Sequence, residues 1–339
     1  MKNGIALIGS TIVDDVLPVL EPGRLTYVDA NKFVPEAELA GEKIKFSVGG
    51  MATNVSVDLA KINGDYPLAL FGKIGTDFRA DIVVETLTRY GIDKTNLQVD
   101  ENNETSSTEV IHFRLPGGTI ERIFRHTLGA MGSFSIEDIN VAKLASYKIA
   151  MFGYGLLLPQ LDLADKEHGT KLGIILAQTQ KLGIKTALDF VSPNRENLFK
   201  FLRYKKTISF VNILCINEDQ ACSLTEVAEP ADACIALVEN LGAEIAVVHC
   251  GAAGPNYAYS LASGLLMQEN FRIPDDECKG NAGAGDAFSA GFLHGTHQDW
   301  PIAQSLKFAA AAAAISLRDE SCTGAMQDQE YILKFMNRE

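Results

Sequence analysis

The chain has 339 residues, of which 47% are hydrophobic and 22% charged, enough for one large α/β domain or two ordinary ones. Its net charge of −13 argues against nucleic acid and anionic membranes as partners, because both repel a negative surface. We recognise no signal peptide or membrane-spanning run, so we expect a cytoplasmic protein. The six cysteines form no C-x-x-C pair, which favours reduced core thiols over a zinc or redox site.

Short apolar runs alternate with helical patterns at the start of the chain. Residues 4–9 form an apolar run that ends in glycine and predicts a buried parallel strand. A helix is predicted at about 52–62, a second buried strand over 67–75, and a second helix at about 79–90. This β-α-β-α order predicts a parallel sheet with helices on both faces.

Two segments, 20–48 and 108–124, interrupt this alternation. The first ends in the alternating sequence KIKFSV, and the second consists of two alternating stretches around a Pro-Gly-Gly turn, which is a hairpin signal. Together they predict a small β-sheet inserted into the α/β domain. Both a lid over an active site and a surface for homodimer formation are consistent with such a sheet.

The second half of the chain returns to the α/β pattern, and the run FAAAAAAI predicts a closely packed helix. Without an internal repeat or a flexible linker, the expectation is a single domain over residues 1–339 with the lid inserted in it. The predicted strands cover 147–152, 184–190, 211–216 and 243–250, and the predicted helices 169–183, 217–224, 231–241, 283–297 and 301–318.

The sharpest local signal is GNAGAGDAFSAGFLHG, residues 280–295, a glycine-rich turn that leads into a helix. The free amides at a helix start attract anions, and Gly283 and Gly285 allow the backbone around Ala284 to approach a phosphate. Asp286 in the same turn can accept a proton. An anion hole beside a general base is what phosphoryl transfer to a hydroxyl requires. The alternative is a glycine-rich turn in which the aspartate only caps the helix.

Several other catalytic motifs are absent from the sequence. There is no P-loop, no H-E-x-x-H and no G-x-S-x-G, which disfavours P-loop nucleotide hydrolysis, zinc proteolysis and α/β-hydrolase chemistry. No G-x-G-x-x-G follows the first strand, which disfavours a dinucleotide-dependent oxidoreductase.

Two distant segments resemble the signatures of the ribokinase-like carbohydrate kinases, also called the PfkB family. The segment GAGDAFSAGF resembles the C-terminal signature, and GGMATNVSVDLAKING, residues 49–64, resembles the N-terminal one. The resemblance extends over residues 4 to about 326. It implies a doubly wound, mostly parallel sheet with a β-lid, and ATP-dependent phosphorylation of a sugar or sugar-like hydroxyl.

The resemblance also implies roles for single residues. Asp286 would be the base, and the amides of Gly283, Ala284 and Gly285 would form the anion hole. Three residues would hold substrate hydroxyls: Asp14, Gly50 and Asn54. For Asp14 and Asn54 the alternative is that each only caps a turn or a helix.

On the nucleotide side, the resemblance implies that Gly251 and Gly254 line the nucleotide site and that Asn217 belongs to an Asn-x-x-Glu motif that organises magnesium and phosphate. Asn217 could instead only cap the following helix. The implied cofactors are ATP and Mg²⁺, with a monovalent cation as a further candidate, and no side chain is assigned as a direct metal ligand.

The chain departs from the family pattern at five positions, the first being Ala80, which replaces the last glycine of a G-x-[IV]-G-x-D-x-x-G pattern at 72–80. Gln220 stands where the motif has glutamate, Gly280 and Asn281 where Asp-Thr is usual, and Ala310 where a late helix often has asparagine. These four departures put the metal network and the nucleotide preference in doubt, because Gln220 lacks the charge of a carboxylate. Arg125 and His126, just after the second lid strand, either reach a phosphate or hydroxyl or lie in a solvated loop.

The function predicted from the sequence is therefore an ATP-dependent kinase that acts on a small sugar or sugar acid. A nucleoside kinase of the same family is the alternative within that class. A catalytically weak sugar or nucleotide sensor is the alternative outside it. The identity of the acceptor and the oligomeric state stay open.

Overall fold

The computed structural model describes residues 2–16, 45–114, 120–191, 198–251, 254–274 and 276–337. Its main feature is a nine-stranded sheet in the order β15-β14-β13-β12-β11-β8-β1-β4-β5. All neighbouring strands from β5 to β13 are parallel, and β14 and β15 add an antiparallel edge. The strands are β1 Ile5–Gly9, β4 Leu68–Ile74, β5 Asp93–Val99, β8 Ile149–Gly155, β11 Lys185–Phe190, β12 Ile213–Asn217, β13 Ile245–His249, β14 Asn256–Ser260 and β15 Gly264–Gln268.

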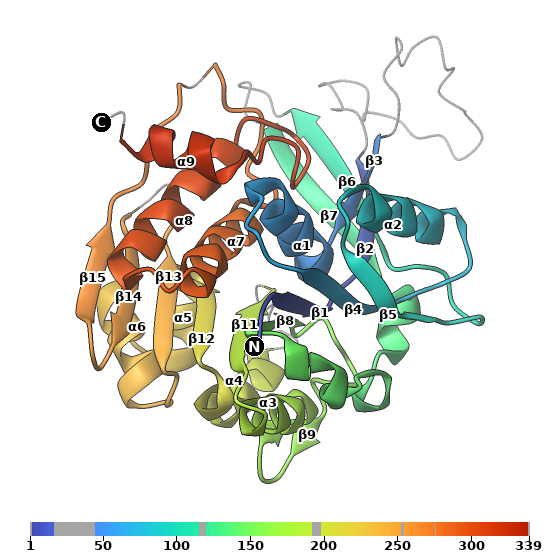
Figure 1. The fold of residues 1–339 in the computed structure, drawn as a ribbon, viewed down its shortest axis with the longest axis horizontal. Helices are drawn as coiled ribbons and strands as arrows, with labels where there is room; N and C mark the ends of the chain where they lie inside the picture. The colour runs from blue at the N-terminus through green and yellow to red at the C-terminus, as the bar shows by residue number, and fades with distance from the viewer. Residues whose placement is uncertain are drawn as a thin grey trace.

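The sheet is buried on both faces, which explains why its strands are continuous apolar runs. In β1, Ile5 and Leu7 point into one core, while Ala6 and Ile8 point into the other. Figure 1 shows α1, α7, α8 and α9 grouped apart from α3, α4, α5 and α6, and the side chains of these two groups belong to the two separate cores. The doubly wound α/β prediction is confirmed.

The predicted helices are found close to their predicted positions, α4 and α9 were not predicted, and most of the helices are capped by a side chain or a glycine. Asp77 caps α2 and Thr170 caps α3 through side-chain oxygens, as helix starts commonly require. The helices are α1 Met51–Ile62, α2 Phe78–Arg89, α3 Lys171–Lys181, α4 Leu198–Thr207, α5 Glu218–Thr225, α6 Pro230–Glu239, α7 Ala284–His297, α8 Ile302–Ser316 and α9 Gln329–Met336.

A separate four-stranded sheet, which we call the lid sheet, has the order β3-β2-β6-β7. The predicted hairpin over 108–124 corresponds to β6 and β7, while of the predicted segment 20–48 only residues 45–48, in β3, lie within the described residues. The strands are β2 Ile12–Val16, β3 Lys45–Gly49, β6 Ser107–Arg114 and β7 Ile120–Thr127. A further two-stranded ribbon joins β9 Ala164–Asp165 to β10 Gly169–Thr170.

The two faces of the lid sheet have different neighbours. Asp15 and Phe46, which are paired in register, face α2, where Arg79 binds the Asp15 carboxylate and Phe78 packs edge-on against Phe46 at 5.4 Å. Asp14 belongs to the opposite face because side chains alternate along a strand. Short 3₁₀ segments connect β7 to β8 and α4 to β12: Gly129–Ser133, Ile136–Asp138, Val141–Ser146 and Ile208–Phe210.

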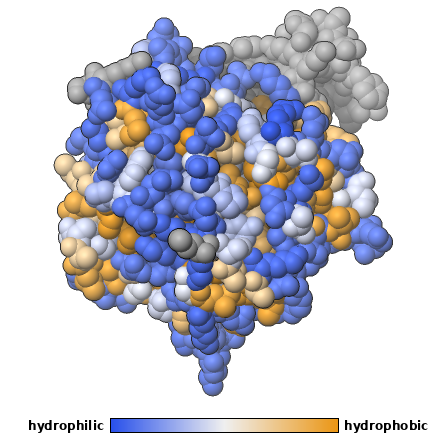
Figure 2. Space-filling view, viewed as in Figure 1, coloured by the Kyte–Doolittle hydropathy of each residue, from blue (hydrophilic) through white to orange (hydrophobic). Residues whose placement is uncertain are grey.

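The outer surface is mostly hydrophilic, with apolar side chains in separate patches on the face drawn in Figure 2. Among the helices of the described residues, none combines the length and the apolar character that a membrane crossing requires. All six cysteines are unpaired, and Cys215, Cys234 and Cys250 are buried.

Candidate active site

The glycine-rich turn and Asp286 lie at the start of α7, where the sequence predicts a helix N-terminus. Gly283 precedes the helix with a left-handed φ of 76°, and Asp286 is only 3% exposed. Asn54 of α1 donates a hydrogen bond of 2.8 Å to Asp286 Oδ2, and the Tyr154 hydroxyl at the end of β8 donates to Oδ1. Both carboxylate oxygens are therefore oriented by groups from other elements.

The pKa of Asp286 is raised above its ordinary value because the carboxyl is buried. The hydrogen bonds from Tyr154 and Asn54 act in the opposite direction, since they stabilise the ionised form. A carboxylate with a raised pKa is a stronger base than a solvated one, which suits the removal of a proton from a hydroxyl near neutral pH.

The turn before Asp286 requires glycine at one position for steric reasons. A Cβ on Gly283 would lie 2.3 Å from the carbonyl oxygen of Cys322, and the positive φ also disfavours other residues. The amide of Ala284 donates only a long bond of 3.4 Å, to Asn281. In the part of the chain that is described, no backbone acceptor is found for the amides of Gly283 and Gly285. Amides in this state at a helix start can bind an anion.

Asp14 lies at the centre of β2, not at the end of a strand, and its carboxylate faces the C-terminal loop after α8. The Cys322 thiol donates to Asp14 Oδ2 at 3.6 Å, and a Cβ on Gly49 would lie 2.4 Å from the same carboxylate. Burial, with smaller contributions from Asp286 and Asp15, raises the pKa of Asp14 to about 7. The Asp14 and Asp286 carboxylates are therefore close enough to influence each other.

The start of α1 brings these groups together. Gly50 precedes the helix with φ 82°, and a Cβ there would lie 2.6 Å from the Ser10 carbonyl oxygen. The Ser10 hydroxyl oxygen accepts from the amides of Met51 and Tyr154, which links the ends of β1 and β8 to α1. Asn54 lies inside α1 and does not cap it, and within the described residues its buried Oδ1 has no hydrogen-bond partner.

The residues expected on the nucleotide side lie at the ends of β12 and β13. Asn217 caps α5. Its side-chain Oδ1 accepts from the backbone N–H of Gln220 at 2.8 Å, and the side-chain Oε1 of Gln220 accepts from the backbone N–H of Asn217 at 3.1 Å. Gln220 Nε2 donates to the Phe190 carbonyl at 3.0 Å. Both ends of the Gln220 amide thus have partners in the fold, which the sequence pattern alone does not reveal.

The two glycines after β13, Gly251 and Gly254, are both bound by Asn270. Its Nδ2 donates to the carbonyl of Gly254 at 2.7 Å and also to that of Gly251, which has φ 47°. Gly251 lies near Glu218 of α5, and the start of α7 approaches the end of β13, since a Cβ on Gly285 would lie 3.4 Å from the His249 ring. The structure therefore brings Asp286, Asn54, Gly50 and Asp14 together, with Gly251, Gly254 and Asn217 at neighbouring strand ends.

Sequence reasoning did not find several residues of this site. Tyr154 could have been found, because it closely follows the predicted strand 147–152 of a parallel sheet, and ligands bind at the carboxyl ends of such strands. Cys322 lies in a loop with no motif. Asp58 is fully buried, four residues after Asn54 in α1, and both its oxygens lack partners among the described residues. Burial raises its pKa well above the ordinary value.

Arg125 and His126, expected just after the second lid strand, lie within it, in β7, and their side chains are on opposite faces of the lid sheet. The His126 ring lies in the same row as Asp14, through the pairs Asp14–Thr108 and Thr108–His126, and its Nδ1 is 3.0 Å from the Thr108 hydroxyl. Arg125 lies on the other face and binds Glu109. Only His126 therefore shares a face with Asp14.

Comparisons with known proteins agree with this geometry. The model of the pfkB family carbohydrate kinases matches residues 5–329. A 5-dehydro-2-deoxygluconokinase of Geobacillus kaustophilus is 21% identical over 86% of this chain and 85% of its own length, and a ribokinase of Arabidopsis thaliana is 24% identical over 91% and 78%.

The solved structure of Arabidopsis thaliana ribokinase with ribose and ATP covers 100% of both chains, with a TM-score of 0.74 and 20% identity. That likeness confirms the ribokinase-like fold, including a small sheet beside the main one. The family model covers nearly the whole chain and includes both signatures and the buried Asp286. The chain belongs to the pfkB family of carbohydrate kinases.

Proposed function

We propose that this protein transfers the γ-phosphoryl group of ATP to a hydroxyl of a sugar or sugar-like molecule, with Asp286 as the general base. The observation that carries the proposal is the buried Asp286 carboxylate beside free amides at the start of α7, oriented by Asn54 and Tyr154. The hydroxyl proton passes to Asp286, the oxygen bonds to phosphorus, and the bond between that phosphorus and ADP breaks.

The anion hole stabilises charge on the transferred group. The amides of Gly283, Ala284 and Gly285 and the dipole of the 14-residue α7 point at the place where negative charge develops. Asp14, Gly50 and Asn54 hold the acceptor, with His126 facing the same side of the lid sheet as Asp14. The lid sheet excludes water, which would otherwise compete for the phosphoryl group.

The nucleotide lies at the ends of β12 and β13, against the turn that contains Gly251 and Gly254. Glu218 is a carboxylate beside this turn: its Oε1 is 3.8 Å from where a Cβ on Gly251 would be. Among the described residues, no three His, Cys, Asp or Glu side chains are placed to hold a metal directly. Magnesium that is bound by phosphates and water fits such a site and would neutralise phosphate charge.

The proposed acceptor is a sugar or a sugar acid. The relatives include a ribokinase and a 5-dehydro-2-deoxygluconokinase, names that denote a pentose and a sugar acid as acceptors. We also propose that residues 1–339 act as one domain and that a monovalent cation supports turnover. Replacing K⁺ by Na⁺ in the assay tests the cation.

The test of the proposed function is Asp286→Asn in a coupled assay of ADP release with ribose, fructose, 2-keto-3-deoxygluconate, fructose 6-phosphate and nucleosides. The loss of a general base should lower kcat by about 10²–10⁴-fold. Thermal unfolding and ATP binding should stay close to those of the parent protein. A variant that keeps kcat within about threefold, which is roughly 0.65 kcal/mol, contradicts the assignment of the base.

The same assay separates a kinase from a sensor. A sensor would bind ATP or sugar without turnover of any acceptor at any magnesium concentration. If only nucleosides turn over, the acceptor is a nucleoside and not a free sugar, and Asp286 keeps its role as the base.

A further inference from the structure

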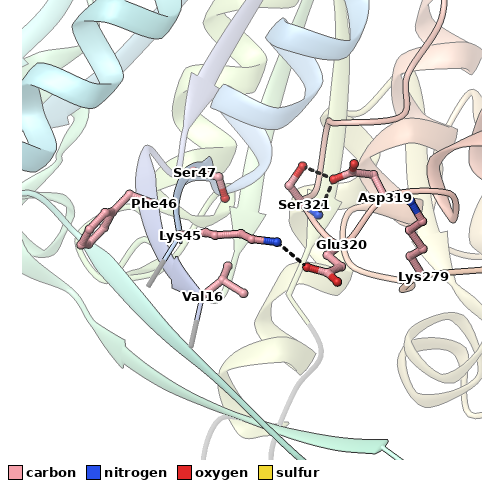
Figure 3. A pocket seen from close by; sticks show the side chains of 8 residues that line it. All are labelled: Val16, Lys45, Phe46, Ser47, Lys279, Asp319, Glu320 and Ser321. Atoms are coloured by element: carbon pink, nitrogen blue, oxygen red, sulfur yellow. Dashed lines mark hydrogen bonds and ion pairs between the residues drawn. The ribbon is translucent and has the colours of Figure 1, made fainter. Parts of the chain in front are cut away.

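A pocket of about 530 Å³ opens between the lid sheet and the loop after α8. Figure 3 shows Lys45, Ser47 and Val16 on the lid side and Asp319, Glu320 and Ser321 on the other. No motif of the sequence marks this place, and the phosphoryl-transfer chemistry described above does not use its side chains.

The pocket is continuous with the acceptor site because its two walls begin there. Ser47 is the register partner of Asp14 across β2 and β3, so the two side chains lie on the same face. On the other wall, Ser321 precedes Cys322, whose thiol contacts Asp14. From Ser47 to Lys45 the strand advances two residues, about 7 Å, away from Asp14. The pocket therefore receives the end of an acceptor that is remote from the reacting hydroxyl.

The wall formed by residues 319–324 is fixed from several directions. The Lys61 ammonium of α1 donates to the carbonyls of Thr323 and Gly324, at 2.6 and 3.2 Å. The Asp319 carboxylate accepts from the amide and hydroxyl of Ser321, at 2.9 and 2.7 Å. The pocket is thus bounded by ordered groups, and the Asp319 carboxylate is oriented by its own loop.

Two ammonium groups face the pocket from opposite sides. Lys45 extends across it to Glu320 at 2.9 Å, in an ion pair whose side chains are 71% and 55% exposed. Lys279, in the segment before the glycine-rich turn, lines the opposite end, and within the described residues it has no ion pair. A pair as exposed as Lys45–Glu320 contributes little to stability, so an anionic ligand can compete with Glu320 for Lys45.

The pocket also contains a hydrogen-bond donor with no partner. The Ser47 hydroxyl is buried and makes no hydrogen bond among the residues described, although it lies beside Asp14. A buried hydroxyl without a partner is costly unless a ligand or water satisfies it. Phe46 points away from the other labelled side chains, and the pocket is lined by apolar groups, such as Val16, as well as by polar ones.

We propose that this pocket binds an anionic group, a carboxylate or a phosphate, at the far end of the phosphoryl acceptor, through Lys45, Lys279 and Ser47. The proposal rests on the proposed kinase function and narrows its substrate class to acidic sugars. Within the pocket the charges of Lys45 and Lys279 are offset by those of Asp319 and Glu320, so an anionic group is held by taking the place of Glu320 beside Lys45 and by adding a partner for Lys279.

The experiment compares anionic and neutral acceptors in the parent protein, Lys279→Met, Lys45→Met and Ser47→Ala. 2-Keto-3-deoxygluconate supplies a carboxylate and fructose 6-phosphate a phosphate, with fructose and ribose as neutral acceptors. Lys334→Met is the matched control, because Lys334 forms a similarly exposed ion pair with Glu330 within α9. The comparison of the two anions identifies which group the pocket takes.

For the preferred anionic acceptor, Lys279→Met should raise KM about tenfold, since hydrogen bonds to charged groups have this order of strength. Lys45→Met should have a smaller effect, because Lys45 is exposed and shared with Glu320. In both lysine variants, the KM for ATP and the kcat/KM for neutral acceptors should change less than twofold. In the control Lys334→Met, all kinetic constants should change less than twofold. Equal losses with neutral acceptors, or no preference for anions in the parent protein, overturn the proposal.

The pocket can be tested separately from the proposed kinase function. If no acceptor turns over, the same compounds are tested by thermal unfolding in the absence of ATP. A rise in Tm with 2-keto-3-deoxygluconate or fructose 6-phosphate that is lost in Lys279→Met supports the pocket even without turnover. An equal rise in Tm in the parent protein and in Lys279→Met, or no rise in either, overturns it.

Discussion

Three buried aspartates, Asp286, Asp58 and Asp189, and the half-buried Asp14 lie at the proposed reaction site, and their charges are not independent. Asp286 raises the pKa of Asp14, Asp58 and Asp189, although burial is the largest cause for each of the three. Asp189 at the end of β11 accepts from Ser289 at 3.2 Å. Adding charge to one of these groups therefore makes ionisation of the others more costly, and the site should respond to pH as a coupled group.

The cost of ionising Asp14 in the folded protein can be measured through the pH dependence of stability. Its pKa is about 7 in the folded protein and 3.8 ordinarily, so between these values the folded state holds a proton that the unfolded chain has released. The stability contribution of Asp14 therefore falls as the pH rises through this window and levels off above about pH 7. We predict that Asp14→Asn raises the free energy of unfolding by about 1–2 kcal/mol at pH 8, with weaker acceptor binding.

Denaturant unfolding of both proteins at pH 5 and pH 8 checks this prediction. The gain in the free energy of unfolding from Asp14→Asn should be larger at pH 8 than at pH 5. In the activity assay, the same change should raise the KM of the acceptor and leave the KM of ATP unchanged. A constant difference across this range would mean that Asp14 keeps an ordinary pKa in the folded protein.

Gln220 has a structural role that the family pattern does not show. The sequence places it where a magnesium-organising glutamate is expected, but its amide caps α5 and donates to the Phe190 carbonyl. Gln220→Glu would set a carboxylate oxygen against that carbonyl at a site only 2% exposed. We predict a loss of about 1–3 kcal/mol in stability and no fall in the magnesium concentration needed for half-maximal activity.

The control for this change is Gln327→Glu, which adds the same charge at an exposed position. It should change stability by less than about 0.5 kcal/mol. A stable Gln220→Glu protein that works at lower magnesium would restore Gln220 to the metal network.

Local chemistry of the site could be predicted from residue types and spacing, but contacts between distant segments could not. Gly283 and Asp286 are adjacent in the sequence, so their relation follows from helix geometry. Cys322 reaches the site through a loop conformation that no local pattern encodes. For Tyr154 the sequence indicates only a place near the end of a strand, while its contact with Asp286 depends on the order of the strands in the sheet. Asp58 looks like any polar residue of an amphipathic helix until its burial is known.

At the scale of elements, the close packing of α7 on α8 depends on small residues. A Cβ on Gly291 would lie 2.8 Å from the Cα of Ala309, which is nearer than atoms in contact allow. The alanine run of α8 was predicted to permit such an approach, and Ala310, in place of the usual asparagine, is only 3% exposed. This packing holds the start of α7, and with it Asp286, in place.

We therefore predict that Gly291→Ala destabilises the protein by about 1–3 kcal/mol through overpacking. Helix propensity alone would predict the opposite sign, because alanine is favoured over glycine by about 1 kcal/mol inside a helix. Gly132→Ala is the control, since the nearest atom to its Cβ would be 3.5 Å away. A higher Tm for Gly291→Ala would show that α7 and α8 can move apart at little cost.

The long helices and buried strands could be predicted from the sequence because their patterns are strong. The predicted helix 283–297 is found as Ala284–His297, and 79–90 as Phe78–Arg89. The amphipathic α4, Leu198–Thr207, and the edge strand β5, Asp93–Val99, were not predicted. A polar edge strand lacks the continuous apolar run of a central one, so its signal is weak.

At the scale of the whole molecule, the lid sheet is linked to the body on both of its faces. Arg79 and Phe78 of α2 bind Asp15 and Phe46 on one face. On the other face, Cys322 contacts Asp14, and Lys45 pairs with Glu320. An acceptor bound between Asp14 and Asp286 would add contacts to the second face only, so its binding should hold the lid sheet closer to the body.

We predict that saturating acceptor slows amide hydrogen exchange in the strands of the lid sheet, β2, β3, β6 and β7. Bound acceptor adds contacts and excludes water there, which lowers the frequency of local opening. The hairpin of β14 and β15 at the far edge of the main sheet is the internal control and should not change. If exchange in the lid strands ignores the acceptor but slows with increasing protein concentration, the sheet is a homodimer surface and does not cover the substrate.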